Sequence, residues 1–459
     1  MENNTQLKEM IRSMVIDLLQ GQKQEAASSQ PVKQAPRGQV EPGVFDTGDD
    51  AIQAAKAAQA RFEDCTLATR EKVIADIRAT MRPRVQELAQ KTVEETGMGR
   101  VADKVLKLNL TLDKTPGVED LVTECETGDN GMTLYELSAY GVIGAITPST
   151  NPAETLICNT IGMLAAGNAV FFSVHPGAKH LSRLLVSELN QIIAKSIGIE
   201  NLIVTLREPS IESAQEMMLH PDVSLLVVTG GPGVVKQALQ SGKKVIGAGA
   251  GNPPAFVDET ADIKKAAQDI VLGASLDNNI LCIAEKSVVA MRQIEPQLVQ
   301  EMVKAGCVLI DNQQDIQRLV DLTVLPNGTP NKKFVGKNAS VILDAAHIPY
   351  NGDPRLIIMR TPKDHPFAVI EMLMPILPVV TVDSFDVCLM LEAGLHHTAT
   401  MHSLNMERLN RMARKMKTSI FVKNGPSYAG LGFSGEGTTT FTIATPTGES
   451  TTSARCFAR

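Results

Sequence analysis

The chain has 459 residues, enough for about three domains, and 43% of them are hydrophobic against 21% charged. That balance is typical of a globular protein and excludes a disordered chain. A net charge of −7, no tryptophan and only 3% aromatic residues argue against the basic, ring-bearing surface of a nucleic-acid binder. No apolar run reaches the roughly 20 residues of a membrane span, because the longest, 368–382, contains a glutamate and two prolines. We therefore expect neither nucleic acid nor a membrane as a partner.

The first 20 residues predict an amphipathic helix. Apolar side chains recur there at helical spacing: Leu7, Met10, Ile11, Met14, Val15, Leu18 and Leu19. Residues 21–42, rich in Gln, Ala, Ser and Pro, have the composition of a flexible linker. So short a helix gains its stability by burying its apolar face, either on its own domain or on another protein. The long linker favours the second interpretation, a tethered docking peptide.

From Phe45 onward the chain alternates helical and strand patterns. The helical period dominates 49–60 and 69–89. Strands rich in β-branched residues are predicted at 142–146, 169–174, 202–204, 224–228 and 244–246, with helices between them at 154–164, 178–195, 212–218 and 234–240. A second alternating block, about 255–422, contains strands at 288–290, 308–310, 340–343 and 379–382. The tail, 425–459, is rich in Gly, Thr and Ser, which predicts strands or an extended arm. The fold expected is two α/β lobes with parallel sheets and ligands at the carboxyl ends of strands.

Three loops at predicted strand ends have the composition of ligand-binding turns. They are 147–152 (Thr-Pro-Ser-Thr-Asn-Pro), 175–177 (His-Pro-Gly) and 229–233 (Thr-Gly-Gly-Pro-Gly). The last opens a predicted helix, whose free N–H groups suit a phosphate. It is not the Rossmann fingerprint, because Lys236 stands where the third glycine belongs, and no P-loop motif occurs in the chain. Each loop alone is an ordinary turn, but three in succession favour a nucleotide-type cofactor.

Cys282 stands apart from the other six cysteines. An odd number of scattered cysteines without a CxxC pair predicts neither a disulfide framework nor a zinc site, and a reducing setting follows. Cys282 comes after Asn278 and Asn279, which favour a turn, and just before a strand, so a thiol there could be ionised and aimed at a carbonyl. Composition alone leaves an inert buried cysteine as the alternative. His396, His397 and His402 lack partners at a metal-ligand spacing, and we expect no metal site.

These segments together resemble the aldehyde dehydrogenase superfamily. The resemblance rests on the three loops and on 247–252 (Gly-Ala-Gly-Ala-Gly-Asn), 282–285 (Cys-Ile-Ala-Glu), 371–375 (Glu-Met-Leu-Met-Pro) and 434–437 (Ser-Gly-Glu-Gly). Within the superfamily, 279–286, 396–400 and 445–449 are similar to the CoA-acylating branch, above all to enzymes of bacterial microcompartments that degrade propanediol or ethanolamine. The likeness extends over 45–459, and residues 4–20 resemble the encapsulation helix of such enzymes.

The resemblance implies a role for particular residues. Cys282 matches the nucleophile, Asn151 and the Cys282 backbone N–H match the oxyanion donors, and His397 matches a proton acceptor for the CoA thiol. Glu371 matches the carboxylate that holds the nicotinamide ribose, and His175 replaces the lysine usual at the adenosine ribose. The cofactor site implied by the resemblance comprises Thr147, Pro148, Ser149, His175, Pro176, Gly177, Thr229, Gly230, Gly231, Glu371 and Pro375. NAD is the expected cofactor, since no obvious cationic clamp for a 2′-phosphate stands at this end, and CoA is the expected co-substrate.

One absence indicates how the acyl group leaves. Hydrolytic aldehyde dehydrogenases carry a water-activating glutamate in a Glu-Leu-Gly-Gly loop, and here no carboxylate occurs between Lys244 and Asp258. Without a positioned base water is a poor nucleophile, by a factor of about 10² or more. A free thiol offers a few per cent thiolate at neutral pH and attacks strongly, which favours CoA. The alternatives are a hydrolytic dehydrogenase and a non-enzymatic protein of the microcompartment shell.

The resemblance thus predicts oxidation of a short-chain aldehyde to acyl-CoA with reduction of NAD. Propionaldehyde is the first expected substrate and acetaldehyde the second. The implied domains are a targeting helix at 1–20, a linker at 21–42, an NAD- and CoA-binding domain at 43–245 with an oligomerisation hairpin near 128–140, a catalytic domain at 246–425 and an oligomerisation arm at 426–459. We expect a homodimer or homotetramer in the microcompartment lumen, bound to a shell or lumen protein through residues 4–20.

Overall fold

The computed structural model of the protein describes residues 41–385 and 395–459. The predicted targeting helix at 1–20, nearly all of the linker and Cys388 lie outside these residues. Within them no helix is long and apolar enough to cross a membrane.

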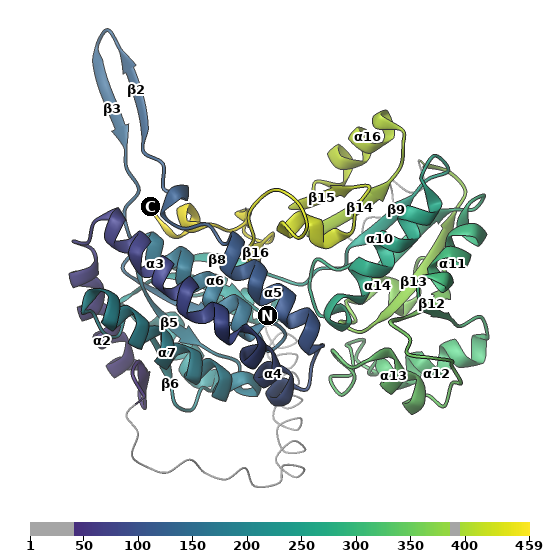
Figure 1. Ribbon diagram of the computed structural model, residues 1–459, viewed down its shortest axis with the longest axis horizontal. Coiled ribbons are helices and arrows are strands. Elements are labelled where there is room, and N and C mark those ends of the chain that lie inside the picture. The colour runs from purple at the N-terminus through teal and green to yellow at the C-terminus, as the bar shows by residue number, and fades with distance from the viewer. Residues whose placement is uncertain (1–40, 386–394) are drawn as a thin grey trace, which may run out of the picture. The chain divides into compact units, whose positions relative to one another are not determined.

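Helices come first in the described chain and cover the first sheet (Figure 1). After a short strand β1 (Val44–Phe45) they are α2 (Gly48–Phe62), α3 (Leu67–Met81), the 3-10 turn η1 (Arg82–Arg84), α4 (Val85–Thr96) and α5 (Val101–Lys114). Thr47 and Thr66 cap α2 and α3 by accepting backbone N–H bonds. The prediction of one helix over 69–89 was wrong, because Pro83 lacks the N–H that an α-helix needs and the chain turns through η1 there.

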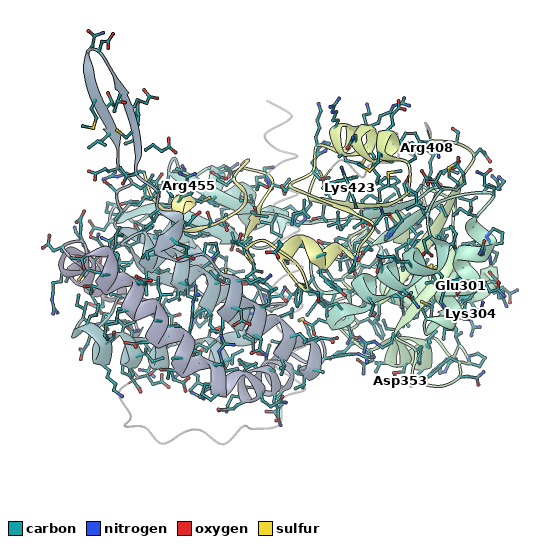
Figure 2. The ribbon with its side chains drawn as sticks, turned by 45° about the horizontal axis from the view of Figure 1, so that its top comes forward. Glu301, Lys304, Asp353, Arg408, Lys423 and Arg455 are labelled. Carbon is teal, nitrogen blue, oxygen red and sulfur yellow. The ribbon has the colours of Figure 1, made fainter. Side chains whose placement is uncertain are left out.

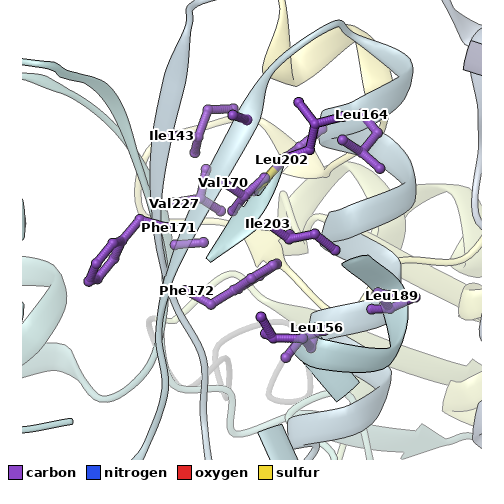
Figure 3. Packing of buried hydrophobic residues seen from close by; sticks show 14 of the residues in the cluster. Ile143, Leu156, Leu164, Val170, Phe171, Phe172, Leu189, Leu202, Ile203 and Val227 are labelled. Carbon is purple, nitrogen blue, oxygen red and sulfur yellow. The ribbon is translucent and has the colours of Figure 1, made fainter. Parts of the chain in front are cut away.

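The first sheet is parallel, with strand order β1-β6-β5-β4-β7-β8. Its other strands are β4 (Val142–Ile146), β5 (Ala169–Ser173), β6 (Ile203–Leu206), β7 (Val223–Thr229) and β8 (Lys244–Ala248). The connecting helices are α6 (Pro152–Ala165), α7 (Lys179–Ile197), preceded by η3 (Pro176–Ala178), α8 (Ile211–Leu219) and α9 (Pro232–Leu239). Figure 3 shows the core between sheet and helices, where Phe172 and Leu156 are fully buried. Strands and helices here match the predicted ones to within a few residues.

The strand order reverses direction between β4 and β7. From β4 the chain builds outward through β5 and β6, then returns to place β7 on the other side of β4. In open α/β sheets such a reversal leaves a crevice outside the carboxyl ends of the two strands, which is where ligands bind. Loops 147–152 and 229–233 follow β4 and β7 and flank this point.

The second sheet is also parallel, with order β11-β12-β13-β10-β9-β14-β15. Its strands are β9 (Pro254–Val257), β10 (Ser287–Met291), β11 (Cys307–Leu309), β12 (Leu356–Arg360), β13 (Ile376–Val382), β14 (Thr398–His402) and β15 (Ile420–Lys423). Its helices are α10 (Ile263–Ser275), continued by η4 (Leu276–Asn279), α11 (Glu295–Lys304), α12 (Gln313–Thr323), α13 (Ala339–Ala345), α14 (Pro366–Val369) and α16 (Met406–Met416). The two sheets confirm the predicted pair of α/β lobes.

One predicted strand in this lobe was wrong. Residues 340–343 lie inside α13, where Ile342 and Leu343 are buried and Val341 is 45% exposed. A four-residue apolar run cannot distinguish a strand from one side of a short helix by periodicity.

Two short antiparallel pairs complete the fold. The hairpin β2 (Glu124–Gly128) and β3 (Gly131–Tyr135), which follows η2 (Val118–Asp120), extends away from the first sheet with every residue exposed (Figure 1). The tail forms η5 (Ser427–Leu431), the pair β16 (Ile443–Ala444) and β17 (Ser450–Thr451), and η6 (Ala454–Phe457). At the base of the hairpin, Ser138 and Arg459 exchange two backbone hydrogen bonds of 2.9 Å. Arg455, labelled there in Figure 2, pairs with Glu124 at 3.3 Å.

Candidate active site

Cys282 lies in the short segment between η4 and β10. Cys282 as a whole residue is partly exposed, whereas its neighbours Leu281 and Ile283 are buried at 2% and 1% exposure. The segment is thus fixed in the core on both sides of the cysteine.

A left-handed turn precedes the cysteine. Asp277, Asn278 and Asn279 have φ angles of 50°, 56° and 67°, a conformation that side chains other than Asn and Asp rarely adopt. Asn278 Nδ2 donates to the Gly336 carbonyl at 2.8 Å, and Asn279 Nδ2 donates to the Ala274 and Glu285 carbonyls at 2.7 and 2.9 Å. The two amides therefore hold the turn that the sequence predicted.

Lys286 fixes the backbone of the cysteine segment from inside. Its Nζ donates to the carbonyl oxygens of Asn279 at 2.9 Å and Leu281 at 2.8 Å. The described chain has no cis peptide, so the Leu281 carbonyl and the Cys282 N–H point to opposite sides of one planar unit. Because Lys286 binds the Leu281 carbonyl, the Cys282 N–H points away from Lys286. That N–H can therefore donate to an anionic oxygen.

Four residues gather at the amino ends of adjacent strands. Gly251 precedes β9, Lys286 precedes β10, Glu371 precedes β13 and His397 precedes β14, and these strands lie in the order β13-β10-β9-β14. Gly251 N–H donates to Glu371 Oε1 at 2.9 Å. A methyl group added at Gly251 would lie 2.4 Å from the Cys282 carbonyl oxygen and 3.0 Å from His397 Cγ. A glycine is needed here because Cys282 and His397 both come this close to its backbone.

The electrostatics of the group centre on Lys286. Burial and the Glu371 carboxylate raise the pKa of Cys282, and Lys286 opposes them. Burial also raises the pKa of Glu371, against Lys286 and the Gly251 N–H. Burial lowers the pKa of Lys286 itself to about 8. Its ammonium is thus the positive group that favours a thiolate on Cys282.

His397 is a neutral imidazole. Burial, and then Lys286, lower its pKa to about 4. Its Nδ1 lies 3.0 Å from Thr398 Oγ1, while the buried Nε2 has no hydrogen-bond partner among the described residues. If Nδ1 is the donor, Nε2 is left as a proton acceptor. The other two histidines lie elsewhere, since His396 Nδ1 bonds the Met416 carbonyl at 2.7 Å and His402 ends β14.

The predicted cofactor loops lie side by side at the carboxyl edge of the first sheet. The Thr147 hydroxyl, directly after β4, is buried without a partner among the described residues. At the last residue of β7, Thr229 Oγ1 lies 2.8 Å from Thr442 Oγ1, and an added Cβ at Gly231 would meet nothing within 4 Å. Pro148 and Ser149 border the same edge and are partly exposed. An orphaned hydroxyl beside an open glycine turn suits the phosphate and ribose groups of a dinucleotide.

The remaining predicted cofactor residues lie at two further places. His175, Pro176 and Gly177 are exposed beyond β5, where His175 Nδ1 accepts the Gly177 N–H at 3.0 Å. Pro375 is buried just before β13, and its carbonyl accepts the Ile357 N–H at 2.9 Å. Pro375 thus belongs with Glu371 at the edge of the second sheet.

Asn151 ends the loop after β4 and directly precedes α6. It is 8% exposed, its Oδ1 accepts from Lys107 Nζ, and its Nδ2 lies 3.3 Å from Thr150 Oγ1. Lys107 also pairs with Asp277, in the turn before Cys282, at 2.6 Å. The structure thereby links the predicted oxyanion residue to the predicted nucleophile segment. Sequence reasoning missed this link, although Lys104 and Lys107 lie on the apolar face of their helix, which was a usable signal.

The sequence matches the aldehyde dehydrogenase family over residues 19–443. It is 51% identical to the propanal dehydrogenase (CoA-propanoylating) of Salmonella typhimurium over 100% of this chain and 97% of that protein. It is 47% identical to the acetylating acetaldehyde dehydrogenase EutE of Escherichia coli over 91% of each.

Solved structures show the same likeness. The propionaldehyde dehydrogenase of Rhodopseudomonas palustris with bound CoA and an acylated cysteine is 49% identical, with a TM-score of 0.89 over 92% of this chain and 97% of that one. The enzyme of the Clostridium phytofermentans fucose utilisation microcompartment is 47% identical, with a TM-score of 0.89 over 91% and 97%. An engineered glycolyl-CoA reductase with bound NADP+ is 49% identical, with a TM-score of 0.89 over 92% and 97%. The chain belongs to the aldehyde dehydrogenase family, which confirms the predicted resemblance and fold class.

Proposed function

We propose that the protein oxidises a short-chain aldehyde to its acyl-CoA thioester, with NAD as the oxidant and Cys282 as the nucleophile. The observation that carries this is the meeting of a partly exposed cysteine, a neutral buried histidine and a buried lysine around Gly251. Relatives named for CoA-propanoylating and acetylating activity support the reaction class.

The first bond forms between Cys282 Sγ and the aldehyde carbon. The attacking species is the thiolate, which the Lys286 ammonium favours against the effect of burial. The carbonyl oxygen gains negative charge and accepts from the Cys282 N–H, whose orientation Lys286 fixes, and from Asn151 Nδ2. A single donor of this kind contributes about 3 kcal/mol to other oxyanion holes.

NAD, when bound, supplies the acceptor for the hydride that leaves the thiohemiacetal carbon. We assign its phosphates and ribose to Thr147, Pro148, Ser149, Thr229, Gly230 and Gly231, its adenosine end to His175, Pro176 and Gly177, and its nicotinamide end to Glu371 and Pro375. Around the adenosine loop, Lys179 is paired with Glu208 at 2.6 Å and would have to leave that ion pair to hold a 2′-phosphate. That arrangement favours NAD over NADP.

Loss of the hydride leaves a thioester on Cys282, which the CoA thiol then attacks. His397 Nε2 accepts the thiol proton, the new C–S bond forms, and Cys282 departs as the thiolate. Because burial and Lys286 lower its pKa to about 4, the imidazole is unprotonated throughout the physiological range and Nε2 is available as an acceptor.

Hydrolysis is the competing exit, and one observation bears on it. The segment 244–258 lacks an internal carboxylate, but the fold brings Glu371 onto it through the Gly251 N–H. One oxygen of that carboxylate is committed to Gly251, and Lys286 faces the group. We therefore assign Glu371 to binding the cofactor ribose, and we expect hydrolysis of the thioester to be a minor reaction.

The test is a rate measurement with propionaldehyde, acetaldehyde and butyraldehyde, each with NAD or NADP and with or without CoA. We expect NADH and acyl-CoA in equal amounts, fastest with propionaldehyde, and little acid without CoA. Cys282→Ala should lower the rate by several orders of magnitude and leave NAD binding intact, whereas Cys307→Ala, at a buried cysteine in the edge strand β11 of the second sheet, serves as the control. More than about one per cent residual activity in Cys282→Ala would refute the nucleophile, and CoA-independent acid would indicate the hydrolytic enzyme.

The proposal also covers location, oligomeric state and partner. We assign the protein to a microcompartment lumen, as a homodimer or homotetramer. We assign residues 4–20 to binding a shell or lumen protein. The microcompartment origin of a 47% identical enzyme supports the location.

A further inference from the structure

Four charged side chains are completely buried beneath the predicted oxyanion residue. They are Lys104 and Lys107 of α5, Glu154 of α6 and Asp277 of η4, each with 0% side-chain exposure. Buried ions are costly unless each is paired and hydrogen-bonded. Two cations and two anions make this cluster neutral, which lets it exist in the core.

Lys107 is the centre of the cluster. Its Nζ donates to Asn151 Oδ1 and forms ion pairs with Asp277 Oδ2 at 2.6 Å and Glu154 Oε1 at 2.9 Å. The ammonium therefore has polar partners on three separate parts of the chain. Burial alone would lower the pKa of Lys107, but Asp277 and Glu154 outweigh it and raise that pKa, so the side chain stays charged.

The ammonium determines which way the Asn151 amide faces. An ammonium only donates, so the atom turned to it must be the carbonyl Oδ1 rather than the amide nitrogen. In a planar amide Nδ2 then lies on the side away from Lys107. Nδ2 donates one of its hydrogens to Thr150 Oγ1, which lies 3.3 Å from the nitrogen, and the other hydrogen is free to donate.

The same ammonium holds the support of the cysteine segment. Asp277 Oδ1 accepts the Arg100 N–H at 2.7 Å, and its Oδ2 accepts from Lys104 at 3.0 Å and Lys107 at 2.6 Å. Asp277 begins the left-handed turn, and strained turns persist only where the surroundings hold them. Lys107 thus joins the loop that carries Asn151 to the turn that leads to Cys282.

We propose that Lys107 is a positioning residue, which holds the Asn151 amide in register with the Cys282 N–H so that both donate to one substrate oxygen. The inference rests on the proposed function and deepens it. Lys107 itself is buried behind Asn151 and acts through that residue.

The test needs a variant that removes the ammonium without leaving a buried charge unpaired. Lys107→Met combined with Glu154→Gln removes one cation and one anion, and Lys104 remains paired with Asp277. We expect kcat for acyl-CoA formation to fall by about 10- to 100-fold, while KM for the aldehyde and the Kd for NAD change less than about threefold. Glu154→Gln alone keeps the Lys107–Asn151 bond and should lose far less.

A double-mutant cycle separates positioning from general disruption. Asn151→Ala is introduced into the wild-type chain and into Lys107→Met/Glu154→Gln, and kcat is measured in all four proteins. If Lys107 acts through Asn151, the triple variant is no slower than Asn151→Ala alone. Melting temperatures confirm folding, and Lys107→Leu in the Glu154→Gln background replaces Lys107→Met/Glu154→Gln if that protein does not fold.

Three results would overturn the inference: a wild-type kcat in the charge-neutral variant, losses that multiply in the triple variant, or a loss confined to KM. Asn151→Ala with wild-type activity would also overturn it, by removing the oxyanion role on which it depends. That last outcome leaves the Cys282 chemistry standing, since the Cys282→Ala assay tests it separately.

Discussion

At the scale of single residues, Lys286 links the geometry of the site to its reactivity. The groups that act on the Cys282 thiol are Glu371, which raises its pKa together with burial, and Lys286 and two backbone N–H groups, which lower it. Lys286 is the only side-chain cation among these groups in the described structure. Its removal should therefore leave the thiol harder to ionise.

We predict that Lys286→Met slows alkylation of Cys282 by iodoacetamide about tenfold at pH 7. The sign follows from the thiolate being the reactive form: a higher thiol pKa means less thiolate at any given pH, so the pH–rate curve moves toward higher pH. Mass spectrometry of the alkylated peptide between pH 6 and 10 measures this. Lys304→Met, at the exposed lysine labelled in Figure 2, is the matched control and should match wild type. An unshifted curve for folded Lys286→Met would show that Lys286 only supports the backbone.

The motifs predict Cys282 and His397 as site residues, but they do not predict the roles that we propose for Lys286 and Lys107. A local motif indicates the chemistry of one loop. The contact between Lys107 and Asn151, by contrast, joins residues that are 44 positions apart in the chain. Such a contact depends on α5 packing against α6, and a single sequence does not contain that packing. What the sequence does offer is the anomaly of two lysines on an apolar helix face, which signals buried charge.

At the scale of elements, the β2–β3 hairpin has one apolar and one acidic face. Cross-strand pairing places Cys125 beside Leu134 and Thr127 beside Met132 on one face, and Glu124 and Glu126 on the other. Met132 and Leu134 are 65% and 56% exposed. A lone hairpin is marginal in water, so an apolar face of this kind needs a covering surface.

We predict that Met132→Lys with Leu134→Lys lowers the oligomeric state of the protein, because the charges prevent burial of that face in another subunit. Light scattering after size exclusion at micromolar concentration measures the mass. Glu126→Gln with Thr133→Ala, on the opposite face, is the control. An unchanged mass would contradict the predicted oligomerisation role. The structure places the hairpin at Glu124–Tyr135, a few residues before the predicted 128–140.

At the scale of the whole molecule, the two sheets present opposite edges to the site. Asn151 and the cofactor loops follow the carboxyl ends of β4, β5 and β7, as the rule for open α/β sheets predicts. Gly251, Lys286, Glu371 and His397 instead precede their strands and lie at the amino edge of the second sheet. The alternating strand and helix patterns of the sequence predict two lobes. They do not predict which edge of the second sheet faces the first lobe, because that depends on contacts between residues far apart in the chain, such as Lys107–Asp277.

The predicted helix at 1–20 lies outside the described residues, and its function is open to a direct experiment. Burying Leu7, Met10, Ile11, Met14, Val15 and Leu18 would contribute several kcal/mol at about 25 cal/mol per Å². Ordering a short helix offsets part of that, so binding should be modest and reversible. If the partner is another protein, the enzyme loses nothing when the segment is removed.

We therefore predict that deleting residues 1–20 leaves kcat and the melting temperature nearly unchanged. The same residues fused to a fluorescent protein should direct it to a microcompartment lumen, and Ile11→Glu with Val15→Glu should abolish this by placing two charges on the apolar face. Glu9→Gln with Ser13→Glu, on the opposite face of the predicted helix, is the control. If instead the helix packs on its own domain, its loss removes stabilising burial, and since 1 kcal/mol shifts the melting temperature by about 2–4 °C for domains of 150–250 residues, the deletion should lower it by several degrees.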